Sequence, residues 1–120
     1  MHIEQIREYC LEKKGSTEGF PFNDNTLVFK VLGKMFLLTG LDSWEKGEAR
    51  ITLKCDPNYT TELRDQYTSV YPGPYVSNKH WNTIDIFKGE LKPQVILQLI
   101  DHSYDMVIKG MTKKLRDSLL

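Results

Sequence analysis

The sequence of 120 residues has few of the side chains that define disulfide-rich, redox and metal-binding proteins. Its two cysteines, Cys10 and Cys55, are far apart, so they form neither a disulfide framework nor the close pair of a zinc or redox motif. None of the three histidines belongs to a His-x-x-x-His motif. We therefore expect two buried thiols, no bound metal and no cofactor.

Long hydrophobic runs are also absent. No apolar stretch approaches the roughly 20 residues that cross a bilayer. The first residues, Met1 to Glu4, lack the basic region followed by an apolar run that marks a secretory signal. The sequence therefore predicts a cytoplasmic protein with no membrane contact.

The chain also lacks an excess of one charge, because 16 Lys and Arg residues balance 16 Asp and Glu residues. A neutral chain lacks the broad positive field that accompanies strong, non-specific nucleic-acid binding. The charges are nevertheless unevenly distributed, since Lys109, Lys113, Lys114 and Arg116 gather near the C-terminus. This basic cluster is either the solvated face of a last helix or a patch that contacts phosphate groups.

Length and hydrophobic periodicity predict one domain that spans residues 1–120. The predicted helices cover residues 2–14, 57–69 and 93–110, and the predicted strands cover residues 20–22, 27–32, 35–39, 50–55 and 82–87, with a polar loop at 42–48. Hairpin-linked strands with helices outside them predict an α+β fold, a two-layer sandwich with helices on one face of an antiparallel sheet. The expected order is roughly α-β(3-4)-α-β-α, with the other sheet face partly open.

The segment from Val70 to Phe87 carries the densest group of candidate binding residues. Two prolines around Gly73 stiffen a turn, which leads through the polar run Ser77-Asn78-Lys79-His80-Trp81-Asn82 into a strand. A rigid turn of this kind places polar groups at the mouth of a strand, which is a common position for binding sites.

Alternation along this strand predicts which side chains face the core. If Ile84 and Ile86 point inward, Asn82 shares their side. Trp81 then lies on the opposite side as an exposed aromatic residue. The alternative is a structural role, in which Trp81 and Ile84 fill the core while Asn78 and Asn82 hydrogen-bond to the loop backbone.

Several motifs carry a resemblance to a known family. They are Gly19-Phe20-Pro21-Phe22, the hairpin from Leu27 to Thr39, Lys79-His80-Trp81-Asn82-Thr83 after a Pro-Gly turn, Ile100-Asp101-His102-Ser103-Tyr104, and the Lys-Lys-x-Arg ending at 113–116. In these motifs the chain resembles the MmcQ/YjbR-like family over nearly its whole length. The resemblance implies an α/β sandwich similar to secretion chaperones and DNA binding through a double-wing arrangement. The chain departs from the family pattern at Pro74-Tyr75, where a Tyr-His pair is common, and at Asn78, where a second lysine is common.

A nucleic-acid surface needs cations for phosphates, planar groups for stacking and amides for base edges, and the run from Asn78 to Trp81 supplies all of these. We therefore predict a nucleic-acid-binding module in which the run touches the ligand and the C-terminal cations neutralise phosphates. The predicted binding residues are Asn78, Lys79, His80, Trp81, Lys113, Lys114 and Arg116. The expected partner is DNA, bound weakly and in a salt-sensitive manner.

A second interpretation is a protein-interaction or peptide-binding adaptor that uses the open sheet face. Trp44, Tyr75 and Trp81 would form its aromatic patch. The sequence leaves the oligomeric state and the choice between DNA and RNA open.

Catalysis is not expected. His80 with Asp85 or Asp101, and Ser77 or Ser103, supply the residue types of a catalytic triad. The chain nevertheless contains no nucleophile elbow and no glycine-rich phosphate loop.

Overall fold

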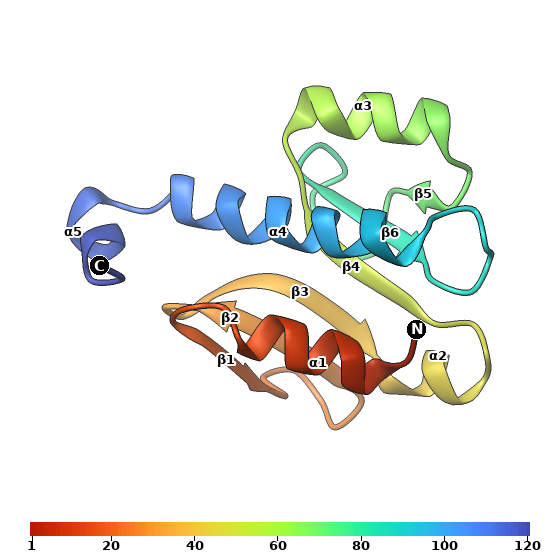
Figure 1. Cartoon of the computed structure of the whole chain (residues 1–120), viewed down its shortest axis with the longest axis horizontal. Coiled ribbons are helices and arrows are strands. Elements are labelled where there is room, and N and C mark those ends of the chain that lie inside the picture. The colour runs from red at the N-terminus through yellow and green to blue at the C-terminus, as the bar shows by residue number, and fades with distance from the viewer.

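Six strands form a single antiparallel sheet, and the main helices cover one of its faces (Figure 1). The structure is a computed structural model and describes residues 1–120. In chain order its elements are α1 (Ile3–Leu11), β1 (Ser16–Gly19), β2 (Thr26–Val31), β3 (Lys34–Gly40), α2 (Leu41–Glu45), β4 (Arg50–Lys54), α3 (Pro57–Gln66), β5 (Val70–Tyr71), β6 (Trp81–Asp85), α4 (Pro93–Lys109) and α5 (Lys113–Asp117). The α+β prediction is therefore confirmed.

The strand order in the sheet is β1-β2-β3-β4-β6-β5. The predicted hairpin between β2 and β3 is confirmed, and both strands lie inside the sheet. Leu32 and Gly33 form its turn with φ angles of 50° and 83°. Two successive positive φ angles are typical of the type I′ turn, whose twist matches that of the paired strands. A bulge in β3 turns both Phe36 and Leu37 toward the core, because Phe29 pairs with Leu37 while Lys30 pairs with Met35.

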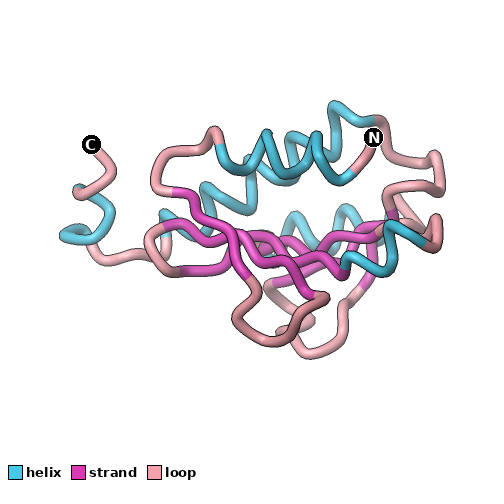
Figure 2. The backbone as a smooth tube through the Cα atoms, turned by 90° about the horizontal axis from the view of Figure 1, so that it is seen from below, coloured by secondary structure: helices cyan, strands magenta, loops and turns pink.

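The hydrophobic core lies between the sheet and its helices (Figure 2). The longest helix, α4, crosses β2, β3 and β4, while α1 packs on β1 and α3 on β5. Helix α4 buries Ile96 and Ile100, and α1 buries Ile6 and Cys10. Both cysteines are free and buried, as the sequence predicted, and burial raises the pKa of the Cys10 thiol to about 12. No helix combines the length and apolarity that a bilayer crossing requires.

Two predicted elements were wrong. Residues 20–22 form a loop, and the edge strand is β1, whose polar Ser-Thr-Glu-Gly sequence has no apolar alternation to reveal it. The predicted loop at 42–48 contains α2, where the Ser43 hydroxyl donates to the Gly40 carbonyl at 2.7 Å. The predicted helices were also too long at their C-terminal ends, and β5 was not predicted because only two residues form it.

The face of the sheet opposite the helices carries two projecting loops, visible below the sheet in Figure 2. They are residues 20–25, between β1 and β2, and residues 72–80, between β5 and β6. Strand β4 alternates, with Ile51 and Leu53 buried and Arg50 exposed on the other side. We call this side the open face.

Candidate nucleic-acid interface

The candidate loop at residues 72–80 is held on the sheet from both ends. At its start, Gly73 lies so close to Thr83 of β6 that a Cβ atom at position 73 would overlap the Thr83 hydroxyl oxygen. At its end, the Ser77 carbonyl accepts hydrogen bonds from the backbone amides of His80 at 3.2 Å and Trp81 at 3.0 Å. The polar run is therefore presented by a closed turn.

Arg64 of α3 fastens the same turn to the body of the protein. Its Nη2 atom donates to the carbonyls of Asn78 at 2.6 Å and Trp81 at 3.0 Å. Its Nε atom donates to Oδ1 of Asn82 at 2.8 Å, and the Asn82 amide nitrogen reaches the Thr60 hydroxyl at 3.2 Å. No sequence motif points to Arg64, because its partners lie 14 to 18 residues further along the chain.

The predicted faces of β6 are confirmed. Asn82, Ile84 and Ile86 are buried on the core side, whereas Trp81 lies on the open face beside its cross-strand partner Lys54. Trp81 is partly exposed rather than fully exposed, and it does not belong to the hydrophobic core. The alternative, in which both side chains fill the core, is therefore wrong for Trp81 and correct for Ile84. The Asn82 side-chain amide hydrogen-bonds to the side chains of Arg64 and Thr60 rather than to the loop backbone.

Strand register brings further cations to the same end of the open face. Lys54, the last residue of β4, pairs with Trp81, the first residue of β6. Lys30 of β2 pairs with Met35 on the open face, next to the β2–β3 turn. Neither Lys30, Lys54 nor Lys79 forms an ion pair. We call Lys30, Lys54, Lys79, His80 and Trp81 the basic end of the sheet.

The C-terminal cations lie at this end as well. Leu119 contacts Gly15, which lies against Leu32 of the β2–β3 turn, and Leu115 packs on the core. Thr112 caps α5, accepting from the Leu115 amide at 3.2 Å. Lys113, Lys114 and Arg116 are exposed and form no ion pairs.

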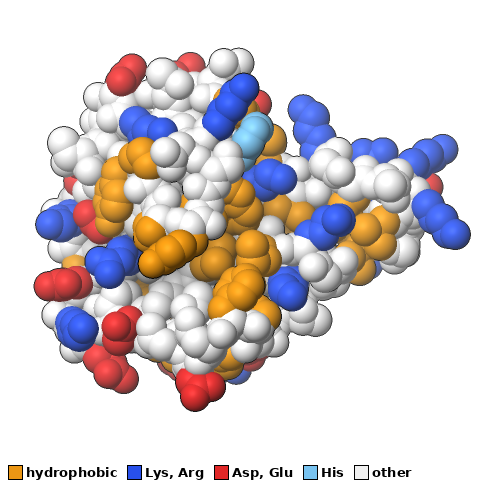
Figure 3. Space-filling model, turned by 180° about the vertical axis from the view of Figure 1, so that it is seen from behind, with side chains coloured by type: hydrophobic (Ala, Val, Ile, Leu, Met, Phe, Trp, Pro, Cys, Tyr) orange, Lys and Arg blue, Asp and Glu red, His pale blue; other side chains and the backbone are white.

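Figure 3 shows Lys and Arg side chains on both halves of this face, while most of the acids visible in this view lie on the half away from the C-terminal extension. Strands β2, β3, β4 and β6 are neighbours, so about 14 Å separates the turn beside α5 from Trp81. The predicted residues thus frame one end of the sheet, although the loop and the tail are separate parts of it.

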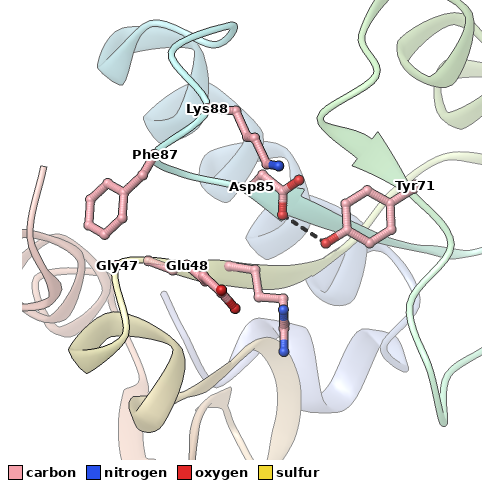
Figure 4. Close-up of a pocket in the computed structure, with 8 residues that line it drawn as sticks. Gly47, Glu48, Tyr71, Asp85, Phe87 and Lys88 are labelled. Atoms are coloured by element: carbon pink, nitrogen blue, oxygen red, sulfur yellow. Dashed lines mark hydrogen bonds between the residues drawn. The ribbon is translucent and has the colours of Figure 1, made fainter.

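A polar pocket of about 440 Å³ lies at the opposite end of the open face (Figure 4). Tyr71 donates to Oδ1 of Asp85 at 2.8 Å, and Arg50 and Lys88 line the same pocket. Burial, together with the bond to Asp85, raises the pKa of Tyr71 to about 12. The phenol therefore remains protonated at neutral pH.

Three of the candidate triad residues, Asp85, Asp101 and Ser103, are engaged elsewhere, Asp85 with Tyr71 in the polar pocket. Ser103 is buried and donates to the Phe36 carbonyl at 2.6 Å. Asp101 accepts from Tyr9 at 2.7 Å and pairs with Lys13, and the His80 ring forms no hydrogen bond with either. No three His, Cys, Asp or Glu side chains lie close enough to hold a metal ion.

The predicted aromatic patch does not include Trp44. The Trp44 indole donates to the Thr39 hydroxyl at 2.8 Å, and its ring packs on the core and edge-on to Phe87. Thr39 belongs to the buried side of β3, so Trp44 does not join Tyr75 and Trp81 on the open face.

These features define an α+β domain with a helix-covered face and an open, loop-bearing face, and comparison with known proteins gives its family. A model of the YjbR family matches residues 11–106, so the chain belongs to the YjbR family. The Escherichia coli O157:H7 protein YbdF is 34% identical over 96 residues, covering 79% of this chain and 75% of that protein. YjbR of Escherichia coli K12 is 24% identical over 120 residues, covering 100% of this chain and 98% of YjbR. Both are described as uncharacterised.

Two solved structures share the fold. The crystal structure of the Deinococcus radiodurans protein DR2400 superposes with a TM-score of 0.86 at 37% identity, covering 98% of this chain and 87% of that one. A protein from Pseudomonas syringae superposes with a TM-score of 0.72 at 23% identity, covering 88% of this chain and 98% of that one. The second likeness supports the fold alone.

Proposed function

We propose that the protein is a non-catalytic module that binds DNA through the basic end of the sheet. The observation that carries this proposal is the arrangement of Lys30, Lys54 and Trp81, which strand register brings to one end of the open face beside Lys79. Unpaired cations attract phosphates, and a partly exposed indole offers a surface on which a base stacks.

The two loops that project from the open face support a double-wing arrangement. Residues 72–80 form the wing nearer the basic end, and the Arg64 clamp keeps that wing fixed before any ligand binds. Residues 20–25 form the other wing. A preformed wing reduces the ordering cost of association.

The test is fluorescence anisotropy of labelled duplex and single-stranded DNA, titrated with the protein from about 50 to 200 mM salt. We expect saturable binding whose affinity falls steeply as salt rises, because released counterions drive phosphate contacts. Absence of binding at the lowest salt would contradict the proposal. Binding that does not respond to salt would contradict it as well, because an apolar contact, of the kind that a protein adaptor makes, is nearly independent of ionic strength.

A further inference from the structure

A groove crosses the open face between the two projecting loops. Met35, Leu38 and Thr52 form its floor, and Phe22 and Tyr75 stand on its two walls. It encloses about 480 Å³, a volume typical of sites for small molecules. Figure 3 shows hydrophobic side chains gathered in the middle of this face.

The walls carry aromatic rings that packing does not explain. Phe22 is 61% exposed, and Tyr75 is fully exposed at 104%. Tyr75 also has a φ angle of 65°, in the left-handed region that residues other than glycine rarely occupy. Strained backbone of this kind concentrates at ligand sites, and two large exposed rings on one groove are typical of a binding surface.

The Tyr75 wall is preformed. Gly73, two residues earlier, rests directly on Thr83, and this contact makes Thr83 almost fully buried although it lies on the open face. The Thr83 hydroxyl is hydrogen-bonded to the Thr52 hydroxyl at 3.0 Å on the groove floor. The loop rests on the sheet at Gly73, two residues before Tyr75, so this wall has a fixed support before any ligand binds.

Arg50 is the only charged side chain that lines the groove. It is exposed and forms no ion pair. Its cross-strand neighbour, Asp85, is engaged with Tyr71 in the adjoining polar pocket. A guanidinium that forms no salt bridge is suited to binding a carboxylate through paired hydrogen bonds.

We propose that this groove binds a small aromatic carboxylic acid. The flat ring lies over Leu38 between Phe22 and Tyr75, and the carboxylate is held by Arg50. The carboxylate-binding end of the groove is separate from the basic end, because Arg50 and Lys54 are the first and last residues of β4 and lie about 13 Å apart. The groove floor extends toward the basic end as far as Met35, the cross-strand partner of Lys30. The proposal therefore goes beyond DNA binding and does not depend on it.

The test compares 2-naphthoate with its neutral counterpart 2-naphthamide, using isothermal titration calorimetry and amide chemical shifts. We expect 2-naphthoate to bind saturably, with shifts centred on Leu38, Thr52 and Thr83, and 2-naphthamide to bind about ten-fold more weakly. The variant Arg50→Gln should weaken 2-naphthoate by about the same factor and leave 2-naphthamide unchanged. The matched control is Lys88→Gln, which removes a cation from the adjoining pocket only.

A second variant tests the walls independently of charge. Phe22→Ser combined with Tyr75→Ser removes two exposed rings and leaves the core intact, so it should weaken both compounds by a similar factor. Equal affinity for the acid and the amide would overturn the proposal, as would the absence of saturable shifts. Stronger binding of thymidine monophosphate than of 2-naphthoate would also overturn it, and would assign the groove to the nucleic-acid surface.

Discussion

Arg64 and Asn82, 18 positions apart in the chain, are joined by a 2.8 Å hydrogen bond from Nε to Oδ1. The same guanidinium holds the carbonyls of Asn78 and Trp81, so one side chain of α3 fixes both the entry to β6 and the candidate loop. Because Asn82 is almost fully buried, its amide oxygen depends on Arg64. Arg64 therefore holds the candidate interface in place, although it is not itself one of the interface residues.

We expect Arg64→Met to lower the free energy of unfolding by about 1–3 kcal/mol, because Asn82 Oδ1 would be left buried without a partner. The amides of residues 78–81 should also exchange hydrogen faster. Urea denaturation and native-state hydrogen exchange measure the two effects. Arg116→Met is the control, since Arg116 is exposed and its loss should change stability by no more than about 0.5 kcal/mol. Equal effects of the two substitutions would show that the hydrogen bonds donated by Arg64 contribute nothing to stability.

The double variant Lys30→Gln, Lys54→Gln should weaken DNA binding and reduce the slope of log affinity against log salt by about 1.8, if each lysine neutralises one phosphate. Anisotropy titrations at several salt concentrations give this slope. The double variant Lys88→Gln, Lys92→Gln removes the same charge from loop residues beyond the other end of β6 and should leave the slope unchanged. A similar loss in both variants would indicate a response to net charge alone.

Replacing Lys113, Lys114 and Arg116 together with alanine should reduce the same slope by up to about 2.7. These side chains are exposed on a short helix at the end of the chain, so circular dichroism and the melting temperature should change little. Unchanged binding with an unchanged salt slope would remove the C-terminal tail from the interface. It would leave the assignment of the loop and the sheet intact.

Gly73→Ala should destabilise the protein by about 1–3 kcal/mol, because the new methyl group overlaps the Thr83 hydroxyl and forces the loop away from the sheet. Thermal denaturation measures the loss. Gly19→Ala is the matched control, since nothing lies within 4 Å of a Cβ atom there and its φ angle is not positive. Combining Gly73→Ala with Thr83→Ala should restore part of the stability, and failure to do so would mean that the contact does not cause the strain.

Tyr71→Phe should lower stability at neutral pH by about 0.5–1.5 kcal/mol through loss of the hydrogen bond to Asp85. Folding raises the pKa of Tyr71 from 10.0 to about 12, so this contribution is complete below pH 10 and is lost as the pH rises toward 12. Stability of the two proteins should therefore converge over that range.

Ultraviolet titration of the tyrosinate band gives a second measurement. Tyr71 and Tyr9 both have pKa values of about 12, and burial also raises the pKa of Tyr59 and Tyr104, so Tyr71→Phe should remove one of several late-ionising groups. Tyr75→Phe serves as the control, because the fully exposed Tyr75 donates no hydrogen bond. An unchanged count of late-ionising tyrosines after Tyr71→Phe would contradict the burial of this phenol.

Much of the fold was predictable because its signals are local. The hairpin between β2 and β3 and the alternation of β6 each depend on a few adjacent residues, and both were found as expected. Sequence prediction failed where the local residues show no hydrophobic periodicity. Strand β1 is stabilised by its pairing with β2, and the short helix α2 by the partly buried Trp44. Neither contact leaves a periodic pattern in the sequence.

The candidate site divides in the same way. Strand alternation and proline geometry are properties of the local backbone, so the sequence indicated that a stiff Pro-Gly-Pro turn precedes Trp81. Alternation also favoured an outward-facing Trp81, although a core position remained the alternative until the structure placed it on the open face. The sequence does not show that Lys30 and Lys54 lie beside that loop, that Arg64 secures it, or that Gly73 shields Thr83 next to the Arg50 groove. These relationships arise from strand register and packing between distant segments, which depend on the whole core and not on neighbouring residues.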